Sequence, residues 1–362
     1  FYPKQQSLAD IRPRRGSRPG GPTARINQFG EAPTMPRKRN VRTKPEPATT
    51  NSGKSSLLRG IGIVGLGLLE PVILAALVTE EPLLLIGAHG TGKSLLLTRI
   101  AEALRLEFRH YNASLLNFDD LVGFPIPVPG GSLEYVKTPA AIWGAEAVIF
   151  DEISRCRPDM QNKLFPVVHE RRVQGIPLEG LRYRWAAMNP PITEEDDDGY
   201  VGSEPLDTAL ADRFAFVVAM PGWELYNEEE QLAVILGDDG TIAAEASDRL
   251  RRCIAAARAA LPTVGSHFGE AVAIYVRTVV ALLAQAGLAL SPRRAGMLHR
   301  SILAVHAVST TINLDSDPAE STLLALRSAL PQRAQGARIP ETKLLGAHRE
   351  AWRLARVGKR DP

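Results

Sequence analysis

Cysteine is scarce in this chain of 362 residues, which contains only Cys156 and Cys253, about 100 positions apart. Neither belongs to a Cys-x-x-Cys pair, and neither has histidines at the spacing of a zinc site. The sequence therefore excludes a disulfide framework and a structural zinc site of that kind. It favours a reducing, cytoplasmic setting.

The apolar segment near the start of the chain is not long enough without interruption to be a membrane anchor. The stretch from Ile61 to Val78 follows a basic segment, as a signal anchor would, but Glu70 and Pro71 interrupt it. A carboxylate at the centre of a membrane span costs about 2.5–3.5 kcal/mol on insertion scales. We therefore expect no membrane span here and predict a packed helix that runs to Val78, ahead of the first strand.

Charge of one sign is concentrated at the start of the chain. Residues 1–59 hold 13 Lys and Arg against three Asp and Glu, whereas the rest of the chain holds 30 against 37. Residues 1–58 lack periodicity, so we predict a disordered basic leader, although a contact with nucleic acid or an anionic membrane also fits. Its Ser52 to Ser55 stretch ends like a phosphate-binding loop but follows no strand. We hypothesise that the natural chain begins at Met35.

The most informative segment follows the apolar run from Pro82 to Ile86 and opens an amphipathic stretch. It has the GxxxxGKS pattern of a phosphate-binding loop, with the strand and the helix that such a loop requires. Glycines let successive N–H groups turn toward phosphates, and the helix start adds its positive dipole end. Lys93 would bridge the β- and γ-phosphates of a nucleoside triphosphate, and the Ser94 hydroxyl would ligate Mg²⁺. The predicted nucleotide-binding residues are Gly87, Ala88, His89, Gly90, Thr91, Gly92, Lys93 and Ser94.

A second segment, Ala147 to Glu152, has four apolar residues followed by two acids. It predicts a buried strand that presents carboxylates at its C-terminal edge, where ligands bind in open α/β sheets. Asp151 would hold Mg²⁺ through water, and Glu152 would orient and polarise the attacking water as a general base. Taken alone, the same pattern also fits a buried strand that ends in solvated acids.

Strand-like and helical patterns alternate between about residues 60 and 221. We predict helices at 93–106, 158–171 and 206–212, and strands at 82–87, 107–112, 146–151, 183–188 and 214–219. This alternation implies a largely parallel sheet with helices on both faces. Pro and Gly between Phe118 and Tyr135 predict a hairpin-like insertion, and a second hairpin from Arg172 to Tyr183 is expected to turn near Glu179 and Gly180.

After Pro221 only helical patterns follow, at about 223–236, 244–261, 266–287, 292–308, 318–330 and 341–357. The fold class is therefore α/β followed by an all-α region. We expect the basic leader at 1–58, a nucleotide-binding domain at 59–221, a helical lid domain at 222–330 and a C-terminal helical extension at 331–362.

Six segments in this order resemble the AAA+ ATPases, and specifically the MoxR group. They are GAHGTGKS at 87–94, VIFDEISR at 148–155, PDMQNKLFPVVHERRV at 158–173, AAMNPP at 186–191, LADRF at 210–214 and SPRRAGML at 291–298. The resemblance covers about residues 60 to 330. It implies a P-loop AAA+ core, with a parallel five-stranded sheet, followed by an all-α lid.

The resemblance also implies roles for residues outside the first two segments. Asn189 matches the sensor-1 position, where its amide would hold the water or the γ-phosphate. Arg213 matches the arginine finger, which the family inserts into the neighbouring subunit's site. Arg293 matches sensor 2 on the lid and would report the γ-phosphate to that domain, although the adjacent Arg294 also fits this position.

Other charged residues receive no firm role from the sequence. Arg155 and Arg171 match basic positions of MoxR-like chains without an assigned function. His89 occupies a variable position of the phosphate-binding loop, so we interpret its imidazole as incidental. The acidic run from Glu194 to Asp198 is either a solvated loop or a site for a basic partner.

The resemblance implies an Mg²⁺-dependent ATPase that forms a homo-hexameric ring and remodels or assembles a protein client, often with a von Willebrand factor A domain protein. The two insertions at 118–135 and 172–183 would contact the client. A nucleic-acid motor is the alternative, because the leader is basic, but no helix-turn-helix or aromatic-interleaved basic stripe supports it. A nucleotide-gated scaffold is a third reading, against which intact Glu152, Asn189 and Arg213 argue. ATP and Mg²⁺ are the expected ligands.

Overall fold

The computed structural model describes residues 56–131, 133–191, 203–237 and 240–355. The chain separates into two units after Ser52, and all described residues belong to the second unit, Gly53–Pro362. Residues 1–55 of the predicted leader, with Met35 and the Ser52 to Ser55 stretch, lie outside the described residues, whereas Leu57 and Leu58 are helical, so the prediction of disorder up to residue 58 is wrong at its end. The acidic run from Glu194 to Asp198 lies outside them as well.

A parallel sheet of five strands in the order β2-β5-β8-β1-β9 forms the centre of the second unit. Its strands have near-continuous apolar sequences because both faces of the sheet are buried. The predicted α/β fold class, with five parallel strands and an all-α region after them, is confirmed. The strands are β1 (Leu83–Ile86), β2 (Phe108–Asn112), β5 (Ala147–Asp151), β8 (Tyr183–Met188) and β9 (Phe216–Ala219).

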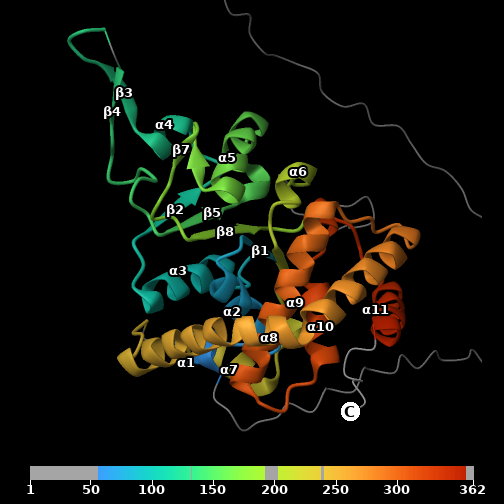
Figure 1. Ribbon diagram of the computed structural model, residues 1–362. Helices are drawn as coiled ribbons and strands as arrows, with labels where there is room; N and C mark the ends of the chain where they lie inside the picture. The colour runs from blue at the N-terminus through green and yellow to red at the C-terminus, as the bar shows by residue number, and fades with distance from the viewer. Residues whose placement is uncertain (1–55, 132, 192–202, 238–239, 356–362) are drawn as a thin grey trace, which may run out of the picture. The chain divides into compact units, whose positions relative to one another are not determined.

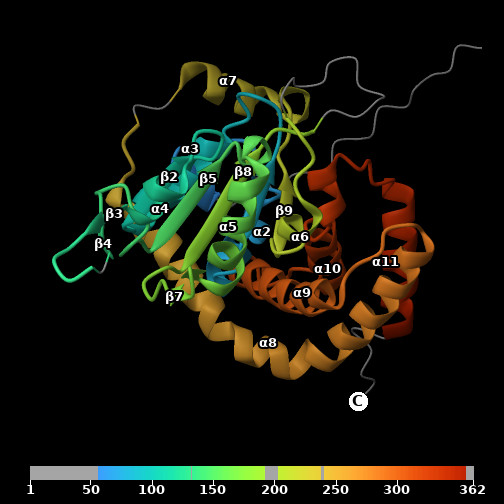
Figure 2. The ribbon, with the colours of Figure 1, turned by 90° about the horizontal axis from the view of Figure 1, so that it is seen from above.

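Helices cover both faces of this sheet, as Figures 1 and 2 show from two directions. Leu83 and Leu85 of β1 belong to one core and Leu84 and Ile86 to the other, since successive side chains of a strand point to opposite faces. The first core contains residues of α2 (Glu70–Thr79), α3 (Lys93–Leu104), α8 (Ala244–Gln285) and α9 (Pro292–Ile312). The second contains residues of α4 (Phe118–Val122), α5 (Pro158–Glu170) and α6 (Thr208–Ala211).

The predicted helix up to Val78 is only partly correct. A short helix, α1 (Leu57–Gly60), is followed by turns until α2 begins at Glu70. Gly62 and Gly65 interrupt the helix because they have φ values of 83° and 79°, a left-handed conformation. Pro71 then fits the first turn of α2, where its missing N–H is not needed. Residues 72–78 are all buried, as expected of a packed helix.

The predicted insertion forms an antiparallel hairpin of β3 (Phe124–Pro127) and β4 (Leu133–Val136). Several large apolar side chains of this hairpin are exposed, namely Phe124, Ile126, Tyr135 and Val136. The hairpin therefore contributes little to either core.

The second predicted hairpin turns at a different place from the one expected. Its strands are β6 (Arg172–Val173) and β7 (Ile176–Pro177), which pair antiparallel. Gln174 and Gly175 form the turn with φ values of 48° and 79°, as a two-residue hairpin turn requires. A turn is also present at Glu179 and Gly180, where Leu181 N donates to Leu178 O at 3.0 Å, but it follows the hairpin and is not its apex, so that part of the prediction is wrong.

A single helix of 42 residues, α8, replaces the two helices predicted at 244–261 and 266–287. The predicted gap at 262–265 begins with Pro262, and proline removes one helical hydrogen bond and usually ends or kinks a helix. Buried residues on both sides of Pro262, such as Ile254 and Val272, pack into the first core and keep the helix continuous. By length and hydropathy α8 is the one helix of the described residues that could cross a membrane, and one side of it packs into the first core.

The remaining helices follow the predicted all-α pattern. The segment around η3 contacts the predicted nucleotide-binding region. Ser328 O accepts a hydrogen bond from Val217 N of β9 at 2.7 Å, and Ala334 O of η3 accepts one from Leu206 N at 3.0 Å. The predicted domain boundaries at 58, 221 and 330 stay predictions. The elements are η1 (Ile153–Arg155), η2 (Trp223–Leu225), α7 (Glu228–Leu236), α10 (Pro318–Arg327), η3 (Pro331–Gln335) and α11 (Glu341–Ala355).

Candidate active site

Three neighbouring strands of the sheet, β5, β8 and β1, end at the same edge, because they are parallel. Asp151 is the last residue of β5, Asn189 follows β8 directly, and the glycine-rich loop follows β1. The structure thus brings together most of the predicted site residues at one edge of the sheet.

The glycine-rich loop forms an open cradle. Gly90 and Gly92 have φ values of 73° and 75°, which other residues rarely adopt, and a Cβ on either would meet no atom within 4 Å. At Gly87, by contrast, a Cβ would lie 2.8 Å from Met220 Cβ and from Thr91 Oγ1. Helix α3 begins directly after Gly92, so the unpaired N–H groups of its first turn adjoin the cradle. An anion is the ligand that such a loop favours.

Lys93 links the loop to the strand beside it. Its Nζ donates to two carbonyl oxygens at the start of the loop, at 2.8 Å each, and to Asn189 Oδ1 at 3.0 Å. Burial lowers the pKa of Lys93, while the nearby carboxylates of Asp151 and Glu152 act in the opposite direction. A buried ammonium with only neutral acceptors is poised to accept phosphate oxygens in their place.

Asp151 is held by three hydrogen-bonding groups. Ser94 Oγ donates to Asp151 Oδ2 at 2.5 Å, and the backbone N–H of Glu152 donates to Oδ1 at 2.9 Å. His110 Nε2, from the neighbouring strand β2, lies 3.4 Å from the same Oδ2. Burial on its own raises the pKa of Asp151, but these hydrogen bonds outweigh it and the net pKa is lowered. Asp151 is therefore a carboxylate at neutral pH.

Glu152 has a left-handed backbone conformation, with φ 54° and ψ 38°. A residue other than glycine rarely adopts it, and such strain is concentrated at functional sites. Its Oε2 lies 3.2 Å from Arg155 Nε as an ion pair, while no donor is aligned with it for a hydrogen bond. The carboxylate is thus positioned next to Asp151 with unused acceptor capacity.

Asn189 is buried and is contacted from both sides. Its Oδ1 accepts from Lys93, and its Nδ2 lies 3.2 Å from Nδ1 of His89. Its carbonyl oxygen accepts from Ser203 Oγ at 3.0 Å. These contacts fix the amide beside the cradle, and they place His89, which the sequence suggested was incidental, in direct contact with a predicted site residue.

The residues at this edge fit a nucleotide bound with Mg²⁺. Mg²⁺ is commonly bound by one or two protein oxygens together with substrate phosphates and waters. The Ser94 hydroxyl and the Asp151 carboxylate supply two such oxygens beside the open cradle. In the part of the chain that the structure describes, no three or more His, Cys, Asp or Glu side chains are grouped so that they could hold a metal ion. Phosphate oxygens and waters would therefore have to complete the coordination of Mg²⁺.

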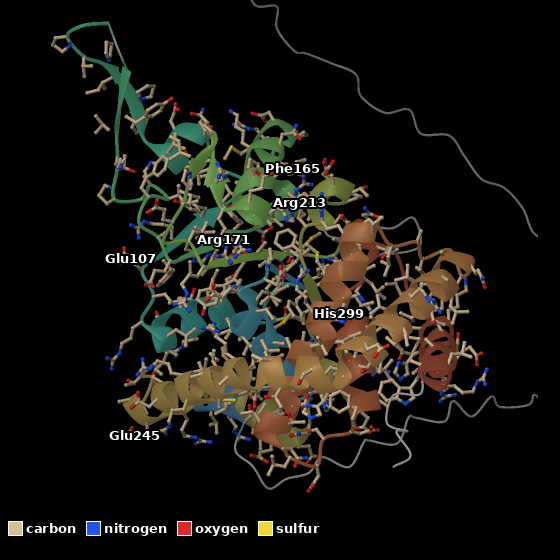
Figure 3. All side chains as sticks on the ribbon, in the orientation of Figure 1. Glu107, Phe165, Arg171, Arg213, Glu245 and His299 are labelled. Atoms are coloured by element: carbon tan, nitrogen blue, oxygen red, sulfur yellow. The ribbon has the colours of Figure 1, made fainter. Side chains whose placement is uncertain are left out.

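Arg213 lies at the opposite edge of the sheet from this cradle. Strands β1 and β9 are parallel, with the start of β9 hydrogen-bonded to Pro82 and its end to Ile86. Arg213 comes before the start of β9, whereas the glycine-rich loop comes after the end of β1. The four-residue strands between them span about 13 Å. Arg213 stacks on Phe165 with its guanidinium 4.6 Å from the ring centroid, and Nη1 donates to Ala209 O at 2.6 Å. Figure 3 labels both residues, which lie near each other in that view. It therefore does not reach the cradle of its own chain.

Arg293 lies beside Arg213 and not beside Lys93. Its Nη1 is 3.3 Å from Asp212 Oδ2, and Arg293 acts to lower the pKa of Arg213, after the larger effect of burial. Arg293 does not lie near the cradle of its own chain, because α9 starts at the opposite edge of the sheet, and its predicted sensor-2 role stays a prediction. Sequence patterns carry no information on which edge a later helix packs against.

Arg294 has a different environment from Arg293. Only 1% of it is exposed, and its guanidinium donates to the carbonyl oxygens of Phe214 and Ala329. Burial lowers its pKa to about 10. Arg294 therefore holds α9 to the start of β9, and only Arg293 remains available to a ligand.

Substitution of Arg294 is expected to lower the stability of the protein much more than substitution of Arg293. Arg294→Ala should lower the free energy of unfolding by about 1–3 kcal/mol for each buried carbonyl left without a donor. Arg293→Ala, whose side chain is 41% exposed, should change it by no more than about 0.5 kcal/mol. Urea denaturation of both variants measures this difference. Equal losses of stability would contradict the separate roles.

Sequence reasoning missed His110 and left Arg155 without a role. His110 contacts Asp151, and Arg155 contacts Glu152. A polar residue inside the predicted strand 107–112 was a signal, but its meaning depends on β2 lying next to β5, which the sequence does not reveal. Arg171, the other unassigned arginine, lies 3.7 Å from Glu80 at the edge opposite the cradle.

Comparison with known proteins agrees with this geometry. Residues 82–214 match the family described as AAA domain (dynein-related subfamily). No curated protein matches the chain in sequence. A crystal structure of a protein from Cytophaga hutchinsonii ATCC 33406, provisionally described as an ATPase, matches with a TM-score of 0.53 and 19% identity over 84% of this chain and 93% of that chain. At this identity the likeness shows the fold alone.

Proposed function

We propose that this protein, which carries an AAA-type ATPase domain at residues 82–214, hydrolyses ATP with Mg²⁺ at boundaries between its own copies. The energy of hydrolysis would serve to remodel or assemble a protein client. This proposal rests on the site geometry first and on the motif order second.

The residues at the cradle suit phosphoanhydride hydrolysis. Lys93 and the N–H groups of the loop would hold the β- and γ-phosphates, and Glu152 would orient and deprotonate the attacking water. Asn189, fixed by Lys93 and His89, would hold the same water or a γ-phosphate oxygen. Ser94 and Asp151 would hold Mg²⁺, which would neutralise charge on the phosphate oxygens when bound.

One observation carries the proposal that two copies share each site. Within one chain, no arginine is seen to contact the cradle residues Lys93, Ser94 or Asn189 among the contacts of the described residues, and Arg213 lies at the far edge of the sheet. Phosphoryl transfer in P-loop enzymes gains about 10³–10⁵ in rate from an arginine finger. Because Arg213 cannot reach the cradle of its own chain, a second copy would supply it. Head-to-tail contacts of this kind close into rings, and we propose a hexamer.

The finer assignment to a MoxR-type chaperone rests on the order of the six motifs. An exposed hairpin with apolar side chains, β3–β4, is suited to contact a protein client. A von Willebrand factor A domain protein is the proposed adaptor. The nucleic-acid motor gains no support from the described residues, since the basic leader that motivates it lies outside them up to residue 55.

Phosphate release by the purified protein tests the proposal. We expect hydrolysis that needs Mg²⁺, stops with EDTA and rises more steeply than in proportion to protein concentration, since each site needs two copies. Lys93→Ala should abolish ATP binding as well as hydrolysis. Hydrolysis per chain that does not change on dilution would contradict shared sites, and stimulation by DNA with a steep salt dependence would favour the motor.

A further inference from the structure

Helix α7 leaves its large apolar side chains in solvent. No residue of α7 is buried, and together with η2 it exposes Leu225, Leu232, Ile235 and Leu236 at 71%, 58%, 68% and 82%. Soluble proteins rarely expose several large apolar side chains next to one another, and such a patch usually marks an interaction site. We call these four residues the α7 surface.

The α7 surface is pre-organised for docking. Leu232, Ile235 and Leu236 have the i, i+3, i+4 spacing that places side chains on one face of a helix. Asn227 and Glu230 form a capping box at its start, and Gly237 with φ 71° ends it. A folded helix with one apolar face is the form that docks into a groove.

A matching cavity lies on the opposite side of the chain. It has a volume of about 850 Å³ and lies between α6, the start of α9 and η3. Apolar side chains line part of it, including Ala209, Leu290 and Pro331. The charged residues Asp207, Asp212, Arg213 and Arg293 and several neutral polar residues line the rest. We call this cavity the α6–α9 pocket.

We propose that the α7 surface of one copy docks into the α6–α9 pocket of the next copy. This inference rests on the proposed function, because it assigns the contact that holds Arg213 at the neighbour's cradle. The charges of the pocket nearly balance, since Asp207 and Asp212 line it together with Arg213 and Arg293, so the apolar side chains of the α7 surface would carry the contact.

The occupant is a second copy because one chain cannot bring the two surfaces together. The α6–α9 pocket adjoins the start of β9, whereas α7 follows its end, and α6 and α7 lie far apart in both Figure 1 and Figure 2. A contact between different surfaces of identical chains is head-to-tail, as a ring requires.

The same contact would align the shared active site. Met220 N donates to Ile86 O at the base of the cradle, and the chain reaches α7 only a few residues later. A neighbour that grips α7 with its α6–α9 pocket therefore presents the arginines of that pocket toward the cradle edge. Docking of α7 and insertion of Arg213 are thus expected to form together.

Two variants that leave the cradle and the arginines unchanged test this inference. Leu232→Ser with Ile235→Ser alters the α7 surface, and Ala289→Glu puts a charge against that surface at the rim of the pocket. Each should raise the protein concentration for half-assembly in sedimentation by about 100-fold or more, and hydrolysis should fall with it. ATP affinity should stay within about two-fold of the wild type. Leu314→Ser with Leu354→Ser, which removes two other exposed apolar side chains, is the matched control.

Mixing the two variants gives the decisive result. The Ala289→Glu chain keeps a native α7 surface and the α7 variant keeps a native pocket, so the mixture should regain dimers and part of the hydrolysis that neither has alone. Assembly and hydrolysis of the α7 variant at wild-type levels would overturn the inference and assign α7 to another partner, while leaving the shared ATPase intact. Wild-type protein without hydrolysis would instead refute the proposed function.

Discussion

Chains with Arg213→Ala should bind ATP as the wild type does and hydrolyse it about 10³-fold more slowly or worse. Arg213 lies at the edge of the sheet opposite the cradle and stacks on Phe165, so its removal leaves Lys93 and Asp151 undisturbed. Fluorescent-nucleotide binding and phosphate release measure the two quantities. Arg327→Ala, which removes an exposed arginine paired with Glu341, serves as the matched control and should change neither.

A mixture separates a shared site from a site within one chain. Arg213→Ala chains retain Glu152, and Glu152→Gln chains retain Arg213, so a boundary between the two in one orientation has both groups. In a ring assembled at random from equal amounts, about a quarter of the boundaries are of this kind, and activity should return to about that fraction. A mixture as inactive as its parts, with rings still present by sedimentation, would contradict the shared site.

The sequence predicts this fold well wherever local pattern and burial agree. The predicted strands at 82–87 and 146–151 contain the apolar runs 83–86 and 147–150, which are apolar because both faces of the sheet are covered, and both runs are in strands. Prediction failed at Pro262, where packing of α8 into the core outweighs a lost hydrogen bond. It also failed at Gly62 and Gly65, where positive φ values interrupt an otherwise apolar stretch.

Some residues of the candidate site could be predicted from the sequence around them, whereas others depend on strand order or helix packing. Lys93, Ser94 and Asp151 could be predicted because the glycine-rich motif that contains Lys93 and Ser94 follows β1, Asp151 ends β5, and parallel strands end at a common edge. The contact of His110 with Asp151 depends on strand order, and the position of Arg293 depends on where α9 packs. Between Arg293 and Arg294 only burial decides, since adjacent helical residues point in different directions.

Glu152→Gln should reduce ATP hydrolysis by about 10²–10⁴-fold, the range for loss of a general base. The amide keeps the size of the side chain but cannot accept a proton, and the strained backbone at Glu152 does not depend on the charge. ATP binding should be retained because Lys93, Ser94 and Asp151 are unchanged. Glu179→Gln, at an exposed carboxylate, is the matched control and should leave the rate unchanged.

The same variant should trap the protein on its client. If ATP binding favours the client-bound state and hydrolysis releases it, Glu152→Gln with ATP should retain a protein that the wild type releases, as pull-down and gel analysis would show. Glu152→Gln combined with Lys93→Ala should retain nothing, because the double variant cannot bind ATP. Retention that survives the Lys93→Ala change would mean that binding is independent of the nucleotide, which contradicts a remodelling cycle driven by ATP.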